Sequence, residues 1–172
     1  MQRLLRKSLS NYDIMNAMHN QCRILTYHQL SKYKSLSNVF GPYDCVFILY
    51  ETRRNYGHWC VLTQNNNRIT FFDSYGMFPD LELKWTSNAF RKSHNMMLPH
   101  LTYLLYHDRS GKQLHYNNVA LQRMDSRIAT CGRWCVLWAK LHWDLTVEQF
   151  AQHFKHYTSN PDEHATKLTY DI

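Results

Sequence analysis

The sequence predicts an α+β domain in which a small central sheet has helices before and after it along the chain. A continuous apolar run at residues 44–51 is typical of a buried central strand. Two runs rich in aromatic and β-branched residues, 57–63 and 68–73, are separated by the polar turn 64–67, which indicates a hairpin. We therefore expect a small mixed sheet that is flanked by helices.

Helical patterns lie on both sides of this hairpin. A short helix is expected over residues 10–22, with Ser10 as its N-cap. From about residue 80 to residue 108 the pattern is helical again, and Pro99 suits the first turn of a helix within that stretch. Short extended pieces are expected near 112–122.

Three further helices are predicted toward the C-terminus. The apolar spacing over 131–142 indicates a buried helix. A Thr-Val-Glu-Gln capping box opens a helix over 146–157. An Asn-Pro-Asp-Glu sequence at 160–163 opens a last short helix, because proline suits a first helical turn and acidic residues suit its positive end.

The length of 172 residues predicts a single domain, residues 1–172. Hydrophobic residues make up 44% of the chain, which excludes a disordered protein and allows a substantial core. Within the domain we expect an N-terminal helical segment at 1–40, a central core at 41–142, and C-terminal helices at 143–172.

The cysteines and the apolar runs indicate the type of compartment. No apolar run approaches the roughly 18 residues of a membrane-spanning helix, and the N-terminus lacks the apolar stretch of a signal peptide. The 5 cysteines are an odd number in a chain too long to need disulfides. We therefore expect free thiols in a reducing compartment and no membrane partner. We also expect a monomer.

The charge is positive and uneven. The formal net charge is +7, and segments 1–54 and 84–127 are both basic, whereas 144–172 is acidic. Such a chain can contact nucleic acid without base specificity, or it can simply carry a solvated basic surface. No recognised nucleic-acid-binding motif decides between the two interpretations.

The hairpin predicts a His–Asp pair. If its turn is centred between Asn65 and Asn66, His58 and Asp73 face each other across the two strands, with Cβ atoms about 5 Å apart. A carboxylate at that position would fix the tautomer of the imidazole and stabilise its protonated form. The alternative is an ordinary surface pair beside the open end of the hairpin.

A candidate nucleophile lies at the start of the helix over 131–142. Unpaired amides and the helix dipole favour a thiolate at Cys131, and its backbone N–H can point toward an oxyanion. Gly132 would leave room for a substrate backbone, and Gln122 could supply a second oxyanion donor. Cys135 lies deeper on the same helix and is expected to be a core residue. A cysteine with a His–Asp pair is the arrangement that a cysteine hydrolase needs.

Four sequence blocks carry a resemblance to a known family. They occur in the order Gly57-His58-Trp59, Phe72-Asp73-Ser74-Tyr75-Gly76, Gln122 with Asp125-Ser126, and Cys131-Gly132-Arg133-Trp134-Cys135. Over about residues 40–140 the chain resembles the adenain-like cysteine proteases. That family includes the adenovirus maturation protease, the SUMO-deconjugating proteases and the maturation proteases of large DNA viruses.

The resemblance implies a papain-like, adenain-like fold with 41–142 as the catalytic core. It implies that His58 is the base, Asp73 the orienting residue, Gln122 the oxyanion donor and Cys131 the nucleophile, with Trp59 beside the substrate groove. The implied function is cleavage of viral precursor proteins after small residues such as Gly-Gly during virion maturation. The implied locations are the host cytoplasm or nucleus and the virion, with no cofactor needed for the chemistry and with DNA or a peptide as a possible activator.

Three alternatives remain open at this stage. The chain could remove ubiquitin or SUMO from conjugates, because these proteases also prefer small residues such as Gly-Gly before the cut. It could be a non-catalytic nucleic-acid-binding module. It could hold zinc with its 11 histidines and 5 cysteines. The nearest approach to the tight ligand pairs of a zinc motif is Cys131-x3-Cys135, and His94, His100, His107 and His115 follow no fixed spacing, so we expect no metal.

Overall fold

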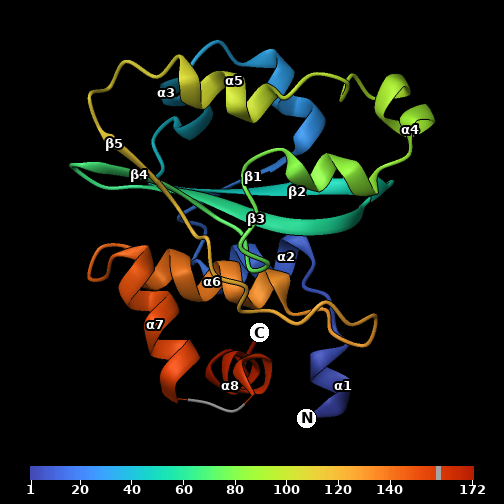
Figure 1. Ribbon diagram of the computed structural model, residues 1–172, viewed down its shortest axis with the longest axis vertical. Coiled ribbons are helices and arrows are strands. Elements are labelled where there is room, and N and C mark those ends of the chain that lie inside the picture. The colour runs from blue at the N-terminus through green and yellow to red at the C-terminus, as the bar shows by residue number, and fades with distance from the viewer. Residues whose placement is uncertain (158–159) are drawn as a thin grey trace.

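The computed structural model describes residues 1–157 and 160–172. Within these residues the centre of the molecule is a five-stranded mixed sheet in the order β1-β2-β3-β4-β5 (Figure 1). The strands are β1 (Arg23–Thr26), β2 (Cys45–Arg53), β3 (Tyr56–Gln64), β4 (Arg68–Phe72) and β5 (Gln113–Tyr116). The α+β prediction and the three strands predicted between residues 44 and 73 are therefore confirmed.

The centre of the sheet is antiparallel and its two edges are parallel. β2 pairs with β3 and β3 with β4 in antiparallel register, whereas β1 runs parallel to β2 and β5 runs parallel to β4. β2 is buried along its first seven residues, because helices cover both faces of the sheet there. This explains why its sequence is a continuous apolar run and not an alternating one.

One face of the sheet is covered by short helices that lie between strands in the chain (Figure 1). They pack on a core that includes Val46 and Ile48 of β2 and Leu62 of β3. These elements are the 3₁₀ helices η1 (Tyr27–Lys32) and η2 (Leu81–Trp85) and the α-helices α3 (Leu36–Phe40), α4 (Asn88–Ser93) and α5 (His100–Tyr106).

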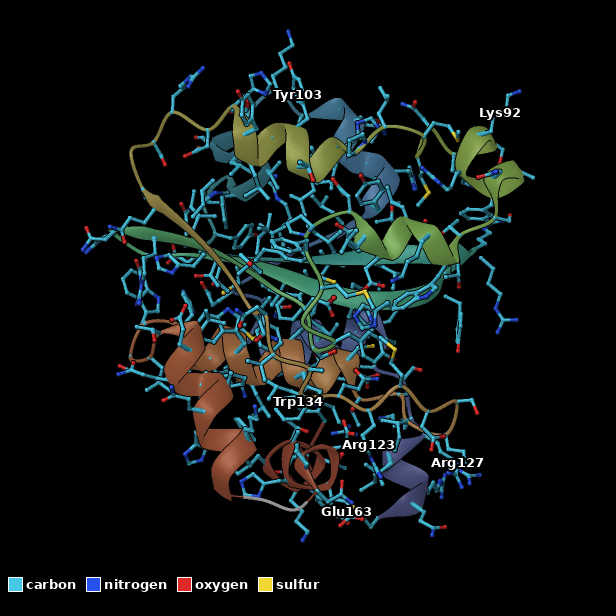
Figure 2. The ribbon with its side chains drawn as sticks, viewed as in Figure 1. Lys92, Tyr103, Arg123, Arg127, Trp134 and Glu163 are labelled. Atoms are coloured by element: carbon cyan, nitrogen blue, oxygen red, sulfur yellow. The ribbon has the colours of Figure 1, made fainter. Side chains whose placement is uncertain are left out.

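The opposite face is covered by helices from both ends of the chain (Figure 1). Its core joins Trp59 and Val61 of β3 to Trp134 and Trp138 of the long central helix. Figure 2 shows Trp134 in this lower layer, below the sheet. The elements nearer the sheet are α2 (Asn11–Ala17), α6 (Cys131–Leu141) and α7 (Val147–Tyr157), and α1 (Gln2–Leu5) and α8 (Pro161–Leu168) lie below α6, farther from the sheet (Figure 1).

The structure corrects three expectations for the helices. The segment 1–40 is not wholly helical, because it contributes the edge strand β1. Pro99 is the N-cap of α5 and does not lie in its first turn. The predicted helix over 10–22 is α2, which is shorter than expected but begins with the Ser10 capping box. None of the described helices is long and apolar enough to cross a membrane.

Candidate active site

Cys131 is the first residue of α6, as its sequence context predicts. The N-cap is Thr130, whose hydroxyl donates a 2.6 Å hydrogen bond to Asp162 of α8 and so fixes the start of the helix. The Cys131 side chain lines a cleft of about 400 Å³ together with His58 and Gln122. Only 7% of Cys131 is exposed, so the thiol lies at the bottom of this cleft.

His58 lies near the start of β3 and contacts Asp73, which directly follows β4. The Nε2 atom of His58 is 2.9 Å from Oδ1 of Asp73. The Asp73 carboxylate also accepts hydrogen bonds from the backbone N–H groups of Tyr75 at 2.8 Å and of Met77 at 3.2 Å. These donors stabilise an ionised Asp73 although it is fully buried.

The register of the hairpin differs from the prediction. Gln64 pairs with Ile69 and Val61 with Phe72, so the turn is centred between Asn66 and Asn67. A shift of two residues keeps every side chain on its own face, because the period of a strand is two. Asp73 therefore approaches His58 as a diagonal neighbour and not as the directly opposite residue, and the predicted contact forms by a different route.

The charges of Cys131 and His58 favour an ion pair. Burial works against ionisation of the thiol, but the positive charge of His58, a hydrogen bond with it, and backbone donors at Trp59 and Gly132 lower the pKa of Cys131. Burial disfavours imidazolium in the same way, yet the charge of Cys131 and the hydrogen bonds with Asp73 and Cys131 raise the pKa of His58 well above its ordinary value. The two groups thus stabilise each other's charged form.

Gln122 is held at the edge of the same cleft by two side chains. Its Oε1 atom accepts a 2.8 Å hydrogen bond from the hydroxyl of Ser74, and its Nε2 atom donates to the Tyr75 hydroxyl at 3.1 Å. The Tyr75 ring stacks on the His58 ring with centroids 4.6 Å apart. The turn that carries Asp73 therefore fixes both the imidazole and the amide. The sequence pattern identified this turn but not the roles of Ser74 and Tyr75.

Trp59 and Gly132 lie beside the N-terminal segment. The Trp59 indole donates a 2.9 Å hydrogen bond to the backbone carbonyl of Leu9, and Trp59 lines a second cavity of about 510 Å³ next to the cleft. A Cβ atom on Gly132 would lie 3.0 Å from that of Leu9. The structure thus departs from the expectation for Gly132, because its open side is filled by Leu9 and it does not line the cleft of Cys131.

No protein-family model matches the chain. It is 38% identical over 167 residues to "Uncharacterized protein V9" of the Sputnik virophage, and the match covers 94% of each chain. The chain belongs to the V9 family.

Solved structures share the fold of this V9-family chain. The ASFV pS273R protease has a TM-score of 0.56 at 13% identity, over 97% of this chain and 68% of that one. A second crystal structure of the same protease has a TM-score of 0.55 at 13% identity, over 97% of this chain and 67% of that one. The V9-family chain therefore has an α+β fold like that of a viral protease.

The other four cysteines of the V9-family chain do not line the cleft, and all 5 cysteines are free and buried. Burial raises the pKa of Cys22 to about 11 and that of Cys45 to about 12. Cys135 is fully buried and its thiol contacts the Trp59 carbonyl at 3.2 Å, in agreement with its predicted place in the core. Cys131 is thus the one thiol among the five whose surroundings favour the thiolate.

Sequence reasoning did not identify Glu82, which lies behind the His–Asp pair. Donor atoms of His58, Cys60, Asp73 and Glu82 all lie within 4.8 Å of one another. These atom types can bind a metal ion such as zinc. A metal at this position would have to displace the 2.9 Å bond between His58 and Asp73. The expectation of no metal stays a prediction.

Proposed function

We propose that this V9-family protein is a cysteine endopeptidase in which Cys131, His58 and Asp73 act as a catalytic triad. The observation that carries the proposal is a single cleft. Cys131 lies there at the N-terminus of α6, and its thiol pKa is lowered by a histidine that is itself bonded to a buried carboxylate. A reactive thiolate beside an oriented imidazolium is what acyl transfer by a cysteine protease requires.

The proposed reaction has two steps. The Cys131 thiolate attacks the carbonyl carbon of the scissile peptide bond, and the proton on His58 passes to the leaving amine. The acyl-enzyme is then hydrolysed by a water molecule whose proton returns to His58, which releases the acid product and restores the Cys131 thiolate beside the His58 imidazolium. Asp73 keeps the imidazole in position and stabilises its positive charge through both steps.

Two donors are proposed for the oxyanion. One is the backbone N–H of Cys131, which is among the unpaired amides of the first turn of α6. The other is the Gln122 side-chain amide, which carries two N–H groups and gives one of them to the Tyr75 hydroxyl. The second N–H is available for the oxygen on which negative charge develops.

The proposed substrates are viral precursor proteins that are cut after small residues such as Gly-Gly. Ser8, Tyr56 and Gly57 line both the Cys131 cleft and the neighbouring cavity beside Trp59, so an extended chain would pass close to the β3 backbone there. Glycine suits such a close approach because it has no side chain. The relation to a virophage protein supports a viral origin for the substrate.

The setting of this activity is part of the proposal. We propose that the enzyme works as a monomer in the cytoplasm or nucleus of the host cell and in the virion, without a cofactor in the chemistry. DNA or a peptide is proposed as an activator, and non-specific DNA as a partner. The free thiols and the positive net charge of +7 support this setting.

A panel of fluorogenic Gly-Gly-X peptides, with ubiquitin and SUMO substrates alongside, tests the function. We expect peptide cleavage that Cys131→Ala abolishes while the fold is kept. Cys22→Ala is the matched control, since it removes a buried thiol outside the cleft. Faster cleavage of ubiquitin or SUMO substrates than of any peptide would support deconjugation instead. Unchanged cleavage by Cys131→Ala would refute the proposal.

A further inference from the structure

Glu82 of η2 is a buried carboxyl group behind the His–Asp pair. Its side chain is 1% exposed, and its Oε1 atom is 3.8 Å from Nε2 of His58. Among the described residues, no group donates a hydrogen bond to either of its carboxyl oxygens. A buried acceptor without a partner is costly, so the group needs either a donor or a proton of its own.

The surroundings of Glu82 disfavour a second negative charge. Asp73 is close to Glu82 and is kept ionised by His58 and by two backbone N–H groups. Burial and the charge of Asp73 raise the pKa of Glu82 to about 9, although the positive charge of His58 acts in the opposite direction. Glu82 is then a neutral carboxylic acid at neutral pH, and it carries an O–H group that can donate.

The other titratable groups that face Glu82 do not compete with Asp73 as acceptors for the O–H group of Glu82. Cys60 of β3 and Cys135 of α6 are buried thiols whose pKa values lie well above the ordinary range. Burial and the charge of Cys131 also raise the pKa of Tyr75, which stays neutral. On η2 itself, Lys84 is exposed and its ammonium lies over the Trp85 ring at 5.3 Å. Asp73 is therefore the ionised oxygen acceptor that Glu82 faces.

We propose that Glu82 is a positioning residue, which donates a hydrogen bond as a neutral carboxylic acid to Asp73 and thereby holds Asp73 against His58. This inference rests on the proposed function, because it extends the Cys131–His58–Asp73 triad by one member. Glu82 does not touch the substrate in this role. It acts through Asp73, and its hydrogen bond keeps that carboxylate ionised in a fully buried position.

The test measures the rate of Cys131 alkylation by iodoacetamide as a function of pH, with EDTA present to exclude bound metals. No substrate is needed, so the result does not depend on whether the correct peptide has been found. The variants are Glu82→Gln, which keeps a neutral donor, and Glu82→Ala, which removes it. Leu83→Ala is the matched control, since it removes a buried side chain from the same segment η2.

We expect Glu82→Ala to move the acid limb of the alkylation profile upward by about one pH unit, because the loss of a hydrogen bond to a charged group raises the pKa of Asp73 by about that amount. Glu82→Gln and Leu83→Ala should keep the wild-type limb. If peptide cleavage is established, Glu82→Ala should also lower kcat by about tenfold with little change in KM.

Two results would overturn the inference. If Glu82 were ionised, Glu82→Gln would remove a charge next to Asp73 and 3.8 Å from His58, and the acid limb would move in that variant as well as in Glu82→Ala. If Glu82 only filled space, the limb would stay in place in both variants. Thermal unfolding of each variant shows whether it folds. If Glu82→Ala does not fold, Glu82→Met, which has a similar length but no hydrogen-bond donor, takes its place and should move the acid limb upward.

Discussion

At the residue scale, His58 and Asp73 are expected to differ in the size of their effects. His58 exchanges the proton and lowers the pKa of Cys131, whereas Asp73 acts on the thiol only through His58. At pH 6, His58→Ala should slow iodoacetamide alkylation of Cys131 by about tenfold or more, because the thiol loses the charge that stabilises its ionised form. Asp73→Asn should slow it less, since an amide oxygen can still accept from the ring.

A matched histidine provides the control for this comparison. His28 lies 3.3 Å from the carboxylate of Glu51, but neither group lines the Cys131 cleft. His28→Ala should leave the alkylation rate unchanged. Alkylation that His58→Ala does not slow would show that the thiolate does not depend on an ion pair with His58.

The Gln122 amide makes a separate prediction about the transition state. Gln122→Ala should lower kcat by about 10²–10³-fold with a smaller change in KM, because the donor binds the developing oxyanion and not the ground-state carbonyl. Gln113→Ala is the control, since that amide lies on β5 outside the cleft. Steady-state kinetics with a cleaved peptide measures both constants. An unchanged kcat in Gln122→Ala would assign the oxyanion to backbone donors alone.

At the element scale, α8 fixes the loop that leads to the nucleophile. The buried Asp162 accepts hydrogen bonds from the Thr130 hydroxyl at 2.6 Å, the Trp134 indole at 3.1 Å and the Arg123 backbone N–H at 3.0 Å. It thereby joins α8 to the start of α6 and to the residue after Gln122. One carboxylate thus aligns two parts of the proposed site.

Asp162→Asn should destabilise the protein by about 1–3 kcal/mol, because one buried donor then faces an amide N–H instead of an oxygen. The midpoint of thermal unfolding should fall, and kcat should fall with it as the start of α6 loosens. Glu163→Gln is the matched control on the next residue of α8 (Figure 2). An unfolding midpoint equal to that of the wild type would contradict this role for Asp162.

The elements also differ in how far the sequence predicts them. β2, β3 and β4 have strong local apolar patterns, and α6 has a clear apolar spacing. β1 consists of Arg-Ile-Leu-Thr and forms because it pairs with β2, a partner that is distant in the sequence. Such pairing leaves no local signal in so short a segment.

The proposed site shows the same limit. Cys131 and His58 can be identified from the sequence because their residue types and neighbours are distinctive. The predicted contact between His58 and Asp73 is present, although the register from which it is predicted is wrong. The turn is a run of polar residues with no glycine, so its centre could not be fixed. Glu82 gives no local signal, because an acidic residue in a helical stretch is usually solvent-exposed.

At the scale of the whole molecule, the basic surface makes a prediction about DNA. Figure 2 shows Arg127 near α1, and it lines a small cavity together with Arg6 and Arg123. Arg127 is also paired with Asp125 at 2.7 Å on the surface. By contrast, Arg23 donates to the carbonyls of Asn38 and Val39 and is engaged within the fold. The other basic residues proposed to contact DNA are Arg3, Lys7, Lys32, Lys34, Arg53, Arg54, Arg91, Lys92, Arg109 and Lys112.

Binding through such residues should be independent of base sequence, and log Kobs should fall with log salt by about 0.9 per phosphate neutralised on duplex DNA. Fluorescence anisotropy with two unrelated duplexes at several salt concentrations measures this. We expect the protein to bind both duplexes with equal affinity and more weakly as salt increases. We also expect added DNA to make peptide cleavage faster. No binding at low salt, or a strong preference for one duplex, would argue that the charge serves only solubility.

The assignment of Cys131 as the nucleophile of a protease is tested most directly with a Gly-Gly peptide that carries a C-terminal vinyl sulfone. The protein is treated at pH 6, and the modified cysteine is mapped by mass spectrometry. We predict one adduct, at Cys131, that is absent in Cys131→Ala and forms more slowly in His58→Ala. Labelling spread over Cys22, Cys45 and Cys135, or an equal adduct yield in Cys131→Ala, would contradict the assignment.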